Sequence, residues 1–183
     1  MNKQVISKEK IIEISKEMIA QDGFNSISIR SIAEKGNVSI GVIYNYFQNK
    51  DEILMATIEA IFKEIGKELL LNDDISFIKM VNDIFNTFKN GSNKYPNFFS
   101  LHTLMISSNE RQKGREVMND YFKELKKHLL KCLNNDLDVN QSIFNNLDKE
   151  KYVDFVFTNI LSLLINHENN CEVLLFSIKH TIY

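Results

Sequence analysis

The sequence is poor in residues that interrupt helices and in residues that hold disulfides or metals. Its 183 residues include one proline and six glycines, while 44% are hydrophobic. Because long interrupted loops need proline and glycine, this composition predicts an all-α fold. The two cysteines, Cys132 and Cys171, have no C-x-x-C spacing and no neighbouring histidine pair, which argues against a disulfide framework and a zinc site. We therefore expect neither a metal nor a cofactor.

Long apolar runs and a strong net charge are also absent. No run of about 18 uncharged apolar residues occurs, and the first ten residues lack the apolar segment of a secretion signal. We therefore expect no membrane partner and a cytoplasmic location. The net charge is −2, so any nucleic acid would have to be bound by a local basic surface. Residues 28–50 form such a region, with three basic residues and one acidic residue.

The N-terminal residues predict three helices. Ser7 can cap the first helix, which Gly23 ends. Two helices of about two turns each follow, capped by Ser28 and Ser39. Gly36 lies between them and is expected to be the residue that ends the first of the two. A short helix, a turn containing glycine and a second short helix form the DNA-binding helix-turn-helix, whose second helix enters the major groove.

The second helix of this motif has two different faces. Val38, Ile43 and Phe47 are spaced to pack inward. The outer face consists of Ile40, Gly41, Tyr44, Asn45 and Gln48. Near the helix tip, Ile40 and Val42 can touch thymine methyl groups, and the amide side chains can reach bases or the backbone.

Two cations and two tyrosines accompany the outer face. Arg30 and Lys50 lie in the first turns of helices, where a cation is disfavoured unless an anion is nearby. Each alone would be interpreted as a solvated surface charge, but beside a helix-turn-helix a DNA phosphate is the expected partner. The hydroxyl of Tyr44 can reach a phosphate oxygen, whereas Tyr46 is expected to be partly packed.

The run SIRSIAEKGNVSIGVIYNYFQNKDEIL resembles the N-terminal signature of the TetR family of bacterial transcriptional repressors. The residues that fit the signature are Ser28, Ile32, Ala33, Val38, Ser39, Gly41, Ile43, Tyr44, Tyr46, Phe47, Lys50 and Leu54. Three positions depart from it, since Gly36-Asn37 replaces the usual Ala-Gly and Val42 replaces a common threonine.

The resemblance implies a DNA-binding domain over residues 1–50 and a divergent helical domain over residues 51–183 that binds a small inducer and dimerises through its last two helices. The resemblance places Ser28, Arg30, Ser39, Tyr44, Tyr46 and Lys50 at operator DNA, and the outer face adds Ile40, Gly41, Val42 and Asn45.

The rest of the chain predicts six more helices, about nine in all. A capping box at Asn49 and Glu52 starts a helix of about 20 residues. The next helix, near 75–89, is expected to stop at Asn90-Gly91-Ser92, and Pro96 is expected to open another. Helices are also expected at about 110–134, 149–166 and 171–182, the last two capped by Asp148 and Asn170, with a loop over 134–147.

Residues 152–166 carry apolar side chains all around the predicted helix, too many for one buried face. This pattern predicts a homodimer, and the alternative is a helix enclosed within its own subunit. The candidate interface residues are Phe155, Val156, Ile160, Leu163, Leu164, Leu174 and Ile178.

Aromatic and methionine side chains form stripes on the helix after Pro96 and on its neighbours. The candidate ligand contacts are Phe85, Phe88, Phe98, Phe99, His102, Met105, Ile106, Met118, Tyr121, Phe122 and Leu125. Such stripes are more often plain core, and His102 is either a satisfied core histidine or a polar handle for a ligand. Because these faces carry few charges, any inducer is expected to be largely apolar.

The sequence as a whole predicts a ligand-responsive transcriptional regulator. We expect a repressor that binds double-stranded palindromic operator DNA as a homodimer and is released by a small apolar inducer. Activation of transcription is the alternative to repression. A helical carrier or sensor without DNA binding is the alternative class. An enzyme is not expected, because the sequence has no glycine-rich phosphate loop, nucleophile elbow or metal-ligand spacing, and its four histidines are dispersed.

Overall fold

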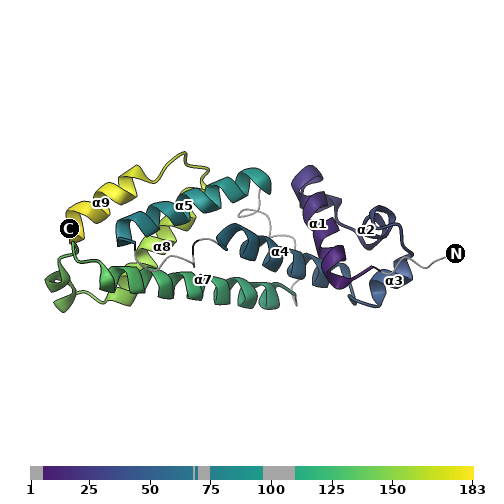
Figure 1. The fold of residues 1–183 in the computed structure, drawn as a ribbon, viewed down its shortest axis with the longest axis horizontal. Helices are drawn as coiled ribbons and strands as arrows, with labels where there is room; N and C mark the ends of the chain where they lie inside the picture. The colour runs from purple at the N-terminus through teal and green to yellow at the C-terminus, as the bar shows by residue number, and fades with distance from the viewer. Residues whose placement is uncertain (1–5, 68, 70–74, 97–109) are drawn as a thin grey trace. The chain divides into compact units, whose positions relative to one another are not determined.

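The computed structural model describes residues 6–67, 69, 75–96 and 110–183, without the side chains of 110–118. These residues form eight α-helices and two 3-10 helices, and none of them forms a strand (Figure 1). The predicted all-α fold is confirmed. One of the nine predicted helices, the one that Pro96 was expected to open, falls on residues 97–109, outside the described residues. A membrane-spanning helix, which needs length together with a nearly uncharged apolar stretch, is not found in the described ranges.

The helices group into two compact units. The first unit comprises Met1–Glu64 and Ser92–Met118, and the second comprises Ile65–Gly91 and Asn119–Tyr183. The long helix α4 (Lys50–Gly66) therefore begins in the first unit and ends in the second. The domain boundary at residue 50 stays a prediction. The packing itself groups most of α4 with the N-terminal helices.

The N-terminal helices have the predicted order. Their bounds are α1 (Lys8–Asp22), the 3-10 helix η1 (Phe24–Ser26), α2 (Ile29–Lys35) and α3 (Ile40–Tyr44). The Ser7 hydroxyl accepts the backbone N–H of Lys10 at 3.2 Å and so caps α1. Gly23 ends α1 with a φ of +74°, a value that favours glycine. On α1, Ile14 is buried in the core, whereas Ile12 is only partly buried.

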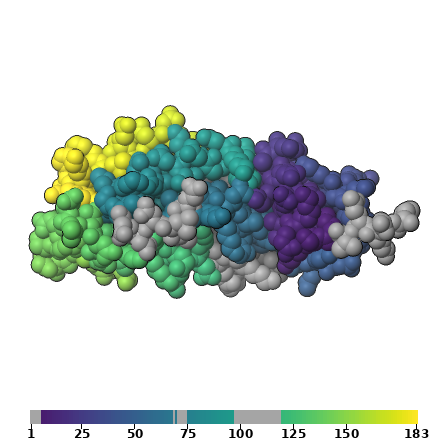
Figure 2. Space-filling model, viewed as in Figure 1, coloured from purple at the N-terminus to yellow at the C-terminus, as the bar shows by residue number. Residues whose placement is uncertain are grey.

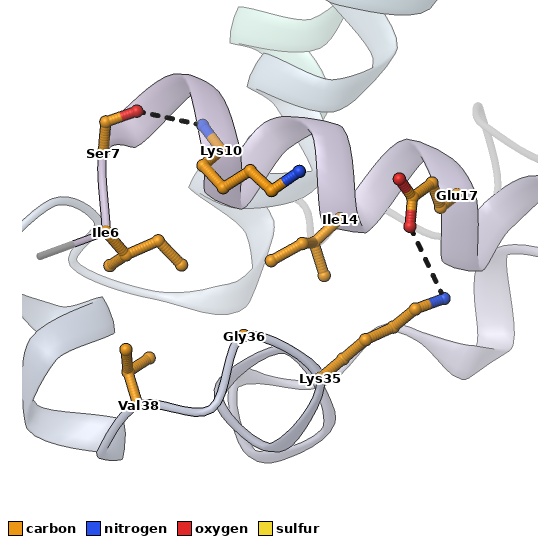
Figure 3. A pocket seen from close by; sticks show the side chains of 8 residues that line it. All are labelled: Ile6, Ser7, Lys10, Ile14, Glu17, Lys35, Gly36 and Val38. Carbon is orange, nitrogen blue, oxygen red and sulfur yellow. Dashed lines mark hydrogen bonds and ion pairs between the residues drawn. The ribbon is translucent and has the colours of Figure 1, made fainter. Parts of the chain in front are cut away.

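The turn between α2 and α3 differs from its prediction. Gly36 has the right-handed helical backbone conformation, with φ −80° and ψ −4°. The residue with a positive φ in this turn is Asn37, at 51°. Asparagine tolerates this conformation because its short polar side chain can bond locally. Gly36 serves close packing instead, because a Cβ there would lie 3.0 Å from Cδ1 of Ile6 and 3.3 Å from Cδ1 of Ile14. Figure 3 shows both isoleucines beside this turn, at the edge of a cavity of about 470 Å³.

The second unit contains the remaining helices. Their bounds are α5 (Phe77–Lys94), α7 (Glu110–Asn135), the 3-10 helix η2 (Gln141–Asn145), α8 (Lys149–Ile165) and α9 (Glu172–Ile182), some of which begin or end in the first unit. The predicted stop at Asn90-Gly91-Ser92 is wrong, because α5 continues through it. A Cβ on Gly91 would lie 2.5 Å from Cδ1 of Ile65. This glycine therefore permits a close approach of two helices rather than ending one.

Side-chain oxygens accept backbone N–H groups at the starts of α5, α8 and α9. The Asp148 carboxylate caps α8 as predicted, accepting the N–H of Lys151 at 2.9 Å. Asn170 accepts the N–H of Glu172 at 3.2 Å, although Cys171 occupies the N-cap position of α9. The predicted loop over 134–147 contains η2 and a buried carboxylate, Asp136, which accepts the N–H of Phe77 at the start of α5.

Candidate nucleic-acid interface

Helix α3 presents one buried face and one exposed face. Its inward residue Ile43 is fully buried, and Phe47 just beyond the helix is 1% exposed. On the other side Ile40 is 44% exposed and Tyr44 is 54% exposed, and Gly41, Asn45 and Gln48 are also exposed. The predicted division of this helix is therefore confirmed for these residues, whereas Val38, the third residue predicted to pack inward, is only half-buried. Helix α3 is shorter than predicted, since it ends at Tyr44 rather than near residue 47.

The two predicted serine caps behave differently. The Ser28 hydroxyl accepts the N–H of Ser31 at 3.0 Å, and the Ser31 hydroxyl accepts the N–H of Ser28, which completes a capping box at the start of α2. Ser39 occupies the N-cap position of α3, but its side chain accepts no capping hydrogen bond from the described backbone. The Ser28 hydroxyl is thus committed to the fold, whereas the exposed Ser39 hydroxyl is not used as a cap.

The two tyrosines also have different environments. The hydroxyl of Tyr46 donates a 2.6 Å hydrogen bond to the carbonyl oxygen of Ile6, and its ring is half-buried. Tyr46 therefore holds the segment before α1 against the helix-turn-helix. Tyr44, on the exposed side of α3, keeps its ring and hydroxyl at the surface.

The basic side chains near α3 are exposed. The Arg30 Nε lies 2.9 Å from Oε1 of Glu34, and both side chains are mostly exposed. Lys50 is exposed at the start of α4, which the Asn49 side chain caps by accepting the N–H of Glu52 at 2.8 Å. An exposed ion pair contributes little to stability, so Arg30 can exchange its carboxylate partner for a phosphate at low cost.

A carboxylate on α4 joins α1 to the end of α5 within the first unit. Glu64 accepts hydrogen bonds from Lys16 of α1, from Lys94 at the end of α5 and, at 2.9 Å, from the Tyr95 hydroxyl. Burial alone would raise the pKa of Glu64, but these hydrogen bonds outweigh it and lower the pKa to about 2. Sequence reasoning missed this cluster because its members lie far apart in the chain.

The predicted ligand contacts fall into two groups. Phe98, Phe99, His102, Met105 and Ile106 lie outside the described residues, as does the side chain of Met118. The others, Phe85, Phe88, Tyr121, Phe122 and Leu125, come together in the second unit on α5 and α7.

The described part of this group is well packed. Phe85, Phe88 and Leu125 are fully buried. The ring centroids of Phe88 and Tyr121 lie 6.4 Å apart, in an edge-to-face arrangement. The end of α4 contacts the same group, because a Cβ on Gly66 would lie 1.4 Å from the Tyr121 hydroxyl oxygen.

The predicted dimer residues mostly face the interior of their own subunit. Five of them are buried: Val156, Ile160, Leu164, Leu174 and Ile178. These five side chains pack in the core of their own chain, and their place in a dimer interface stays a prediction. Leu163 is half-buried, and only Phe155, at 59%, is largely exposed.

An apolar surface that includes Phe155 lies on the opposite sides of α8 and α9 from these buried residues. Phe155 and Ile165 of α8 are 59% and 52% exposed, and Val173 and Phe176 of α9 are 80% and 63% exposed. We call these four residues the α8–α9 patch. In the view of Figure 2, atoms of α9 form part of the outer surface of the second unit. The signal for the patch was present in the sequence, since Val173 and Phe176 lie three residues apart on the side away from Leu174.

Comparison with known proteins places this architecture among bacterial regulators. Residues 11–57 match the family model for bacterial regulatory proteins of the tetR family. A helix-turn-helix transcriptional regulator from Haemophilus influenzae is 37% identical in an alignment 67 residues long, which covers 31% of this chain and 36% of the relative. The chain thus matches about a third of the length of that relative.

Two solved structures share the fold over nearly the whole chain. The first is BioQ with its natural double-stranded DNA operator, with 13% identity, a TM-score of 0.59, and coverage of 96% of this chain and 95% of BioQ. The second is the regulator FadR from Bacillus subtilis in complex with stearoyl-CoA, with 18% identity, a TM-score of 0.62, and coverage of 94% and 95%. At these identities the likeness concerns the fold.

Proposed function

Because the chain belongs to the tetR family of bacterial regulatory proteins, we propose that it regulates transcription by binding double-stranded operator DNA through its helix-turn-helix. The observation that carries this proposal is the exposed, uncharged face of α3 between the cations Arg30 and Lys50. The operator in the BioQ structure supports it for the same fold. Binding to a bacterial operator implies a cytoplasmic location.

We assign the contacts by the chemistry of each side chain. In the major groove, Gly41 lets the backbone of α3 approach the base edges, and Asn45 can hydrogen-bond to bases or backbone. Arg30, Lys50 and the Tyr44 hydroxyl reach phosphates. The remaining proposed contacts on or near the tip are Ser39, Ile40 and Val42. Ser28 and Tyr46 position this surface through the hydrogen bonds that they make inside the chain.

Replacing Arg30 or Lys50 by alanine should weaken operator binding and its dependence on salt. Loss of one phosphate contact reduces the slope of log K against log salt by about 0.9, which corresponds to about eightfold weaker binding at about 0.1 M salt. Fluorescence anisotropy with an operator selected from random duplexes measures both quantities. Lys79→Ala is the matched control, because Lys79 forms an exposed pair with Asp83 of the same i,i+4 spacing on α5. If no duplex is retained in a salt-sensitive manner, a helical carrier becomes the better assignment.

We also propose that the protein acts as a homodimer formed through the α8–α9 patch. Phe155 and Ile165 of α8 and Val173 and Phe176 of α9 are exposed, and exposed aromatic and aliphatic side chains are characteristic of surfaces that bind another protein. A two-fold pairing buries the same patch on both chains and gives two recognition helices, which would select a palindromic operator. Each chain would then read one half-site.

The substitution Phe176→Asp should convert the protein to a monomer, because it places a charge in the centre of the proposed contact. Sedimentation equilibrium measures the association state. The variant should bind a single half-site like the wild type and bind the full palindrome more weakly. Leu137→Asp is the control, since Leu137 is 98% exposed and lies outside the patch. A wild type that stays monomeric at micromolar concentration contradicts the proposal.

The proposed inducer is a small, largely apolar molecule that binds in the second unit. The buried aromatic group on α5 and α7 supports an apolar ligand, and the FadR structure of the same fold contains stearoyl-CoA. Helix α4 is the proposed route to the DNA, because Glu64 holds α1 and Gly66 contacts Tyr121. Titration of stearoyl-CoA into the protein–operator complex tests this assignment. If the protein is a repressor, the ligand should release the DNA.

A further inference from the structure

We propose that Ile40 selects thymine at one position of each operator half-site by contacting its 5-methyl group, an inference that rests on the proposed DNA binding. Ile40 is the first residue of α3 and is 44% exposed. In contrast, Ile11, Ile32 and Ile43 of the same module are completely buried. An exposed isoleucine at the tip of the helix that enters the major groove is therefore not needed for the core.

The surroundings of Ile40 leave it open to a ligand. Within the described residues 6–49, the exposed large apolar or aromatic side chains are Ile40 and Tyr44, which lie four residues apart on one face of α3. The neighbouring Gly41 has no side chain, and the atom nearest to a Cβ built there is the Ser39 hydroxyl oxygen at 3.9 Å. Its two chain neighbours, Ser39 and Gly41, are thus too small to keep a base pair at a distance from Ile40.

The chemistry of the tip favours one base. Helix α3 carries no charged residue, and the side chain of Ile40 has no hydrogen-bond donor or acceptor. The methyl group of thymine is the apolar group that bases display in the major groove, whereas cytosine displays an amino donor at the equivalent edge. Against Ile40 that amino group would lose water without gaining an acceptor, so cytosine is penalised and thymine is favoured.

The test removes the methyl group alone. Each thymine of the selected operator is replaced in turn by 2′-deoxyuridine, and binding is measured by anisotropy. We expect one thymine in each half-site whose replacement weakens wild-type binding about fourfold, as expected for loss of one buried methyl. Placing 5-methylcytosine at the same position should bind more tightly than cytosine. If every thymine tolerates the replacement, the inference is overturned.

Variants of Ile40 assign the methyl effect to this side chain. Ile40→Ala should bind the thymine operator about fourfold more weakly and should no longer distinguish thymine from uracil, while Ile40→Val should retain most of the distinction. Leu137→Ala, the same type of change at another exposed aliphatic residue, should keep the wild-type difference. An undiminished difference in Ile40→Ala overturns the inference but leaves the proposed function standing. Failure to bind any duplex instead rejects the proposed function itself.

Discussion

Replacing Gly66 by alanine should lower the free energy of unfolding by about 3 kcal/mol, although alanine is ordinarily the better helix residue. A Cβ at this position would lie 1.4 Å from the hydroxyl oxygen and 2.7 Å from Cζ of Tyr121. Gly66 does not adopt a positive φ, so the backbone itself has no need for glycine. The whole effect should come from displacement of the Tyr121 ring or of the end of α4.

A double-mutant cycle separates this clash from other effects of the substitution. In a Tyr121→Ala background the added methyl has room, so Gly66→Ala should become neutral or stabilising by up to about 1 kcal/mol. Gly41→Ala is the matched control for stability, since a Cβ there meets nothing closer than 3.9 Å. Urea unfolding followed by circular dichroism gives each free energy. An equal loss in both backgrounds would show that Tyr121 is not the obstacle.

The parts of the fold that the sequence predicted correctly are local. The caps at Ser7, Ser28 and Asn49 join a side chain to a backbone N–H three residues away, so the sequence contains both partners of the interaction. The outer face of α3 followed from helical periodicity for the same reason, because the positions of Ile43 and Phe47 fix the inward direction.

Glycine was misread where its function depends on neighbours that are distant in sequence. A glycine after a helical run can end the helix or can make space for another helix, and the local pattern is the same in both cases. Gly23 has the positive φ of a helix end. Gly36 and Gly91 instead lie against the side chains of Ile6 and Ile65, and no local pattern reveals those contacts.

The residues of a homodimer interface could not be selected from the sequence for a related reason. Helix α8 is apolar on both of its sides, so composition indicated a second surface but did not tell which residues belong to the subunit core. The packing decides this, because Val156 and Ile160 are completely buried while Phe155 is exposed. The carboxylates of Glu64 and Asp136 were missed as well, since each binds groups on elements far away in the chain.

Replacing Asp136 by alanine should lower the free energy of unfolding by about 3 kcal/mol. Its carboxylate is 9% exposed and accepts the N–H of Phe77 at 2.8 Å and the hydroxyl proton of Tyr183. Phe77 is fully buried at the start of α5, so its N–H would lose its partner without gaining water. Burial and the Asp136 carboxylate raise the pKa of Tyr183, which keeps the hydroxyl a donor well above neutral pH.

Two variants separate the buried carboxylate from the loss of one negative charge. Asp138→Ala removes an exposed carboxylate two residues along the chain and should change stability by less than about 0.5 kcal/mol. Tyr183→Phe removes the hydrogen bond to Asp136 and the one that its hydroxyl accepts from the N–H of Ile78, and should cost about 2 kcal/mol. Urea unfolding followed by circular dichroism ranks the three variants. If Asp136→Ala lowered the free energy of unfolding no more than Asp138→Ala does, the Asp136 carboxylate would not hold the start of α5. Apolar packing alone would then keep α5 in place.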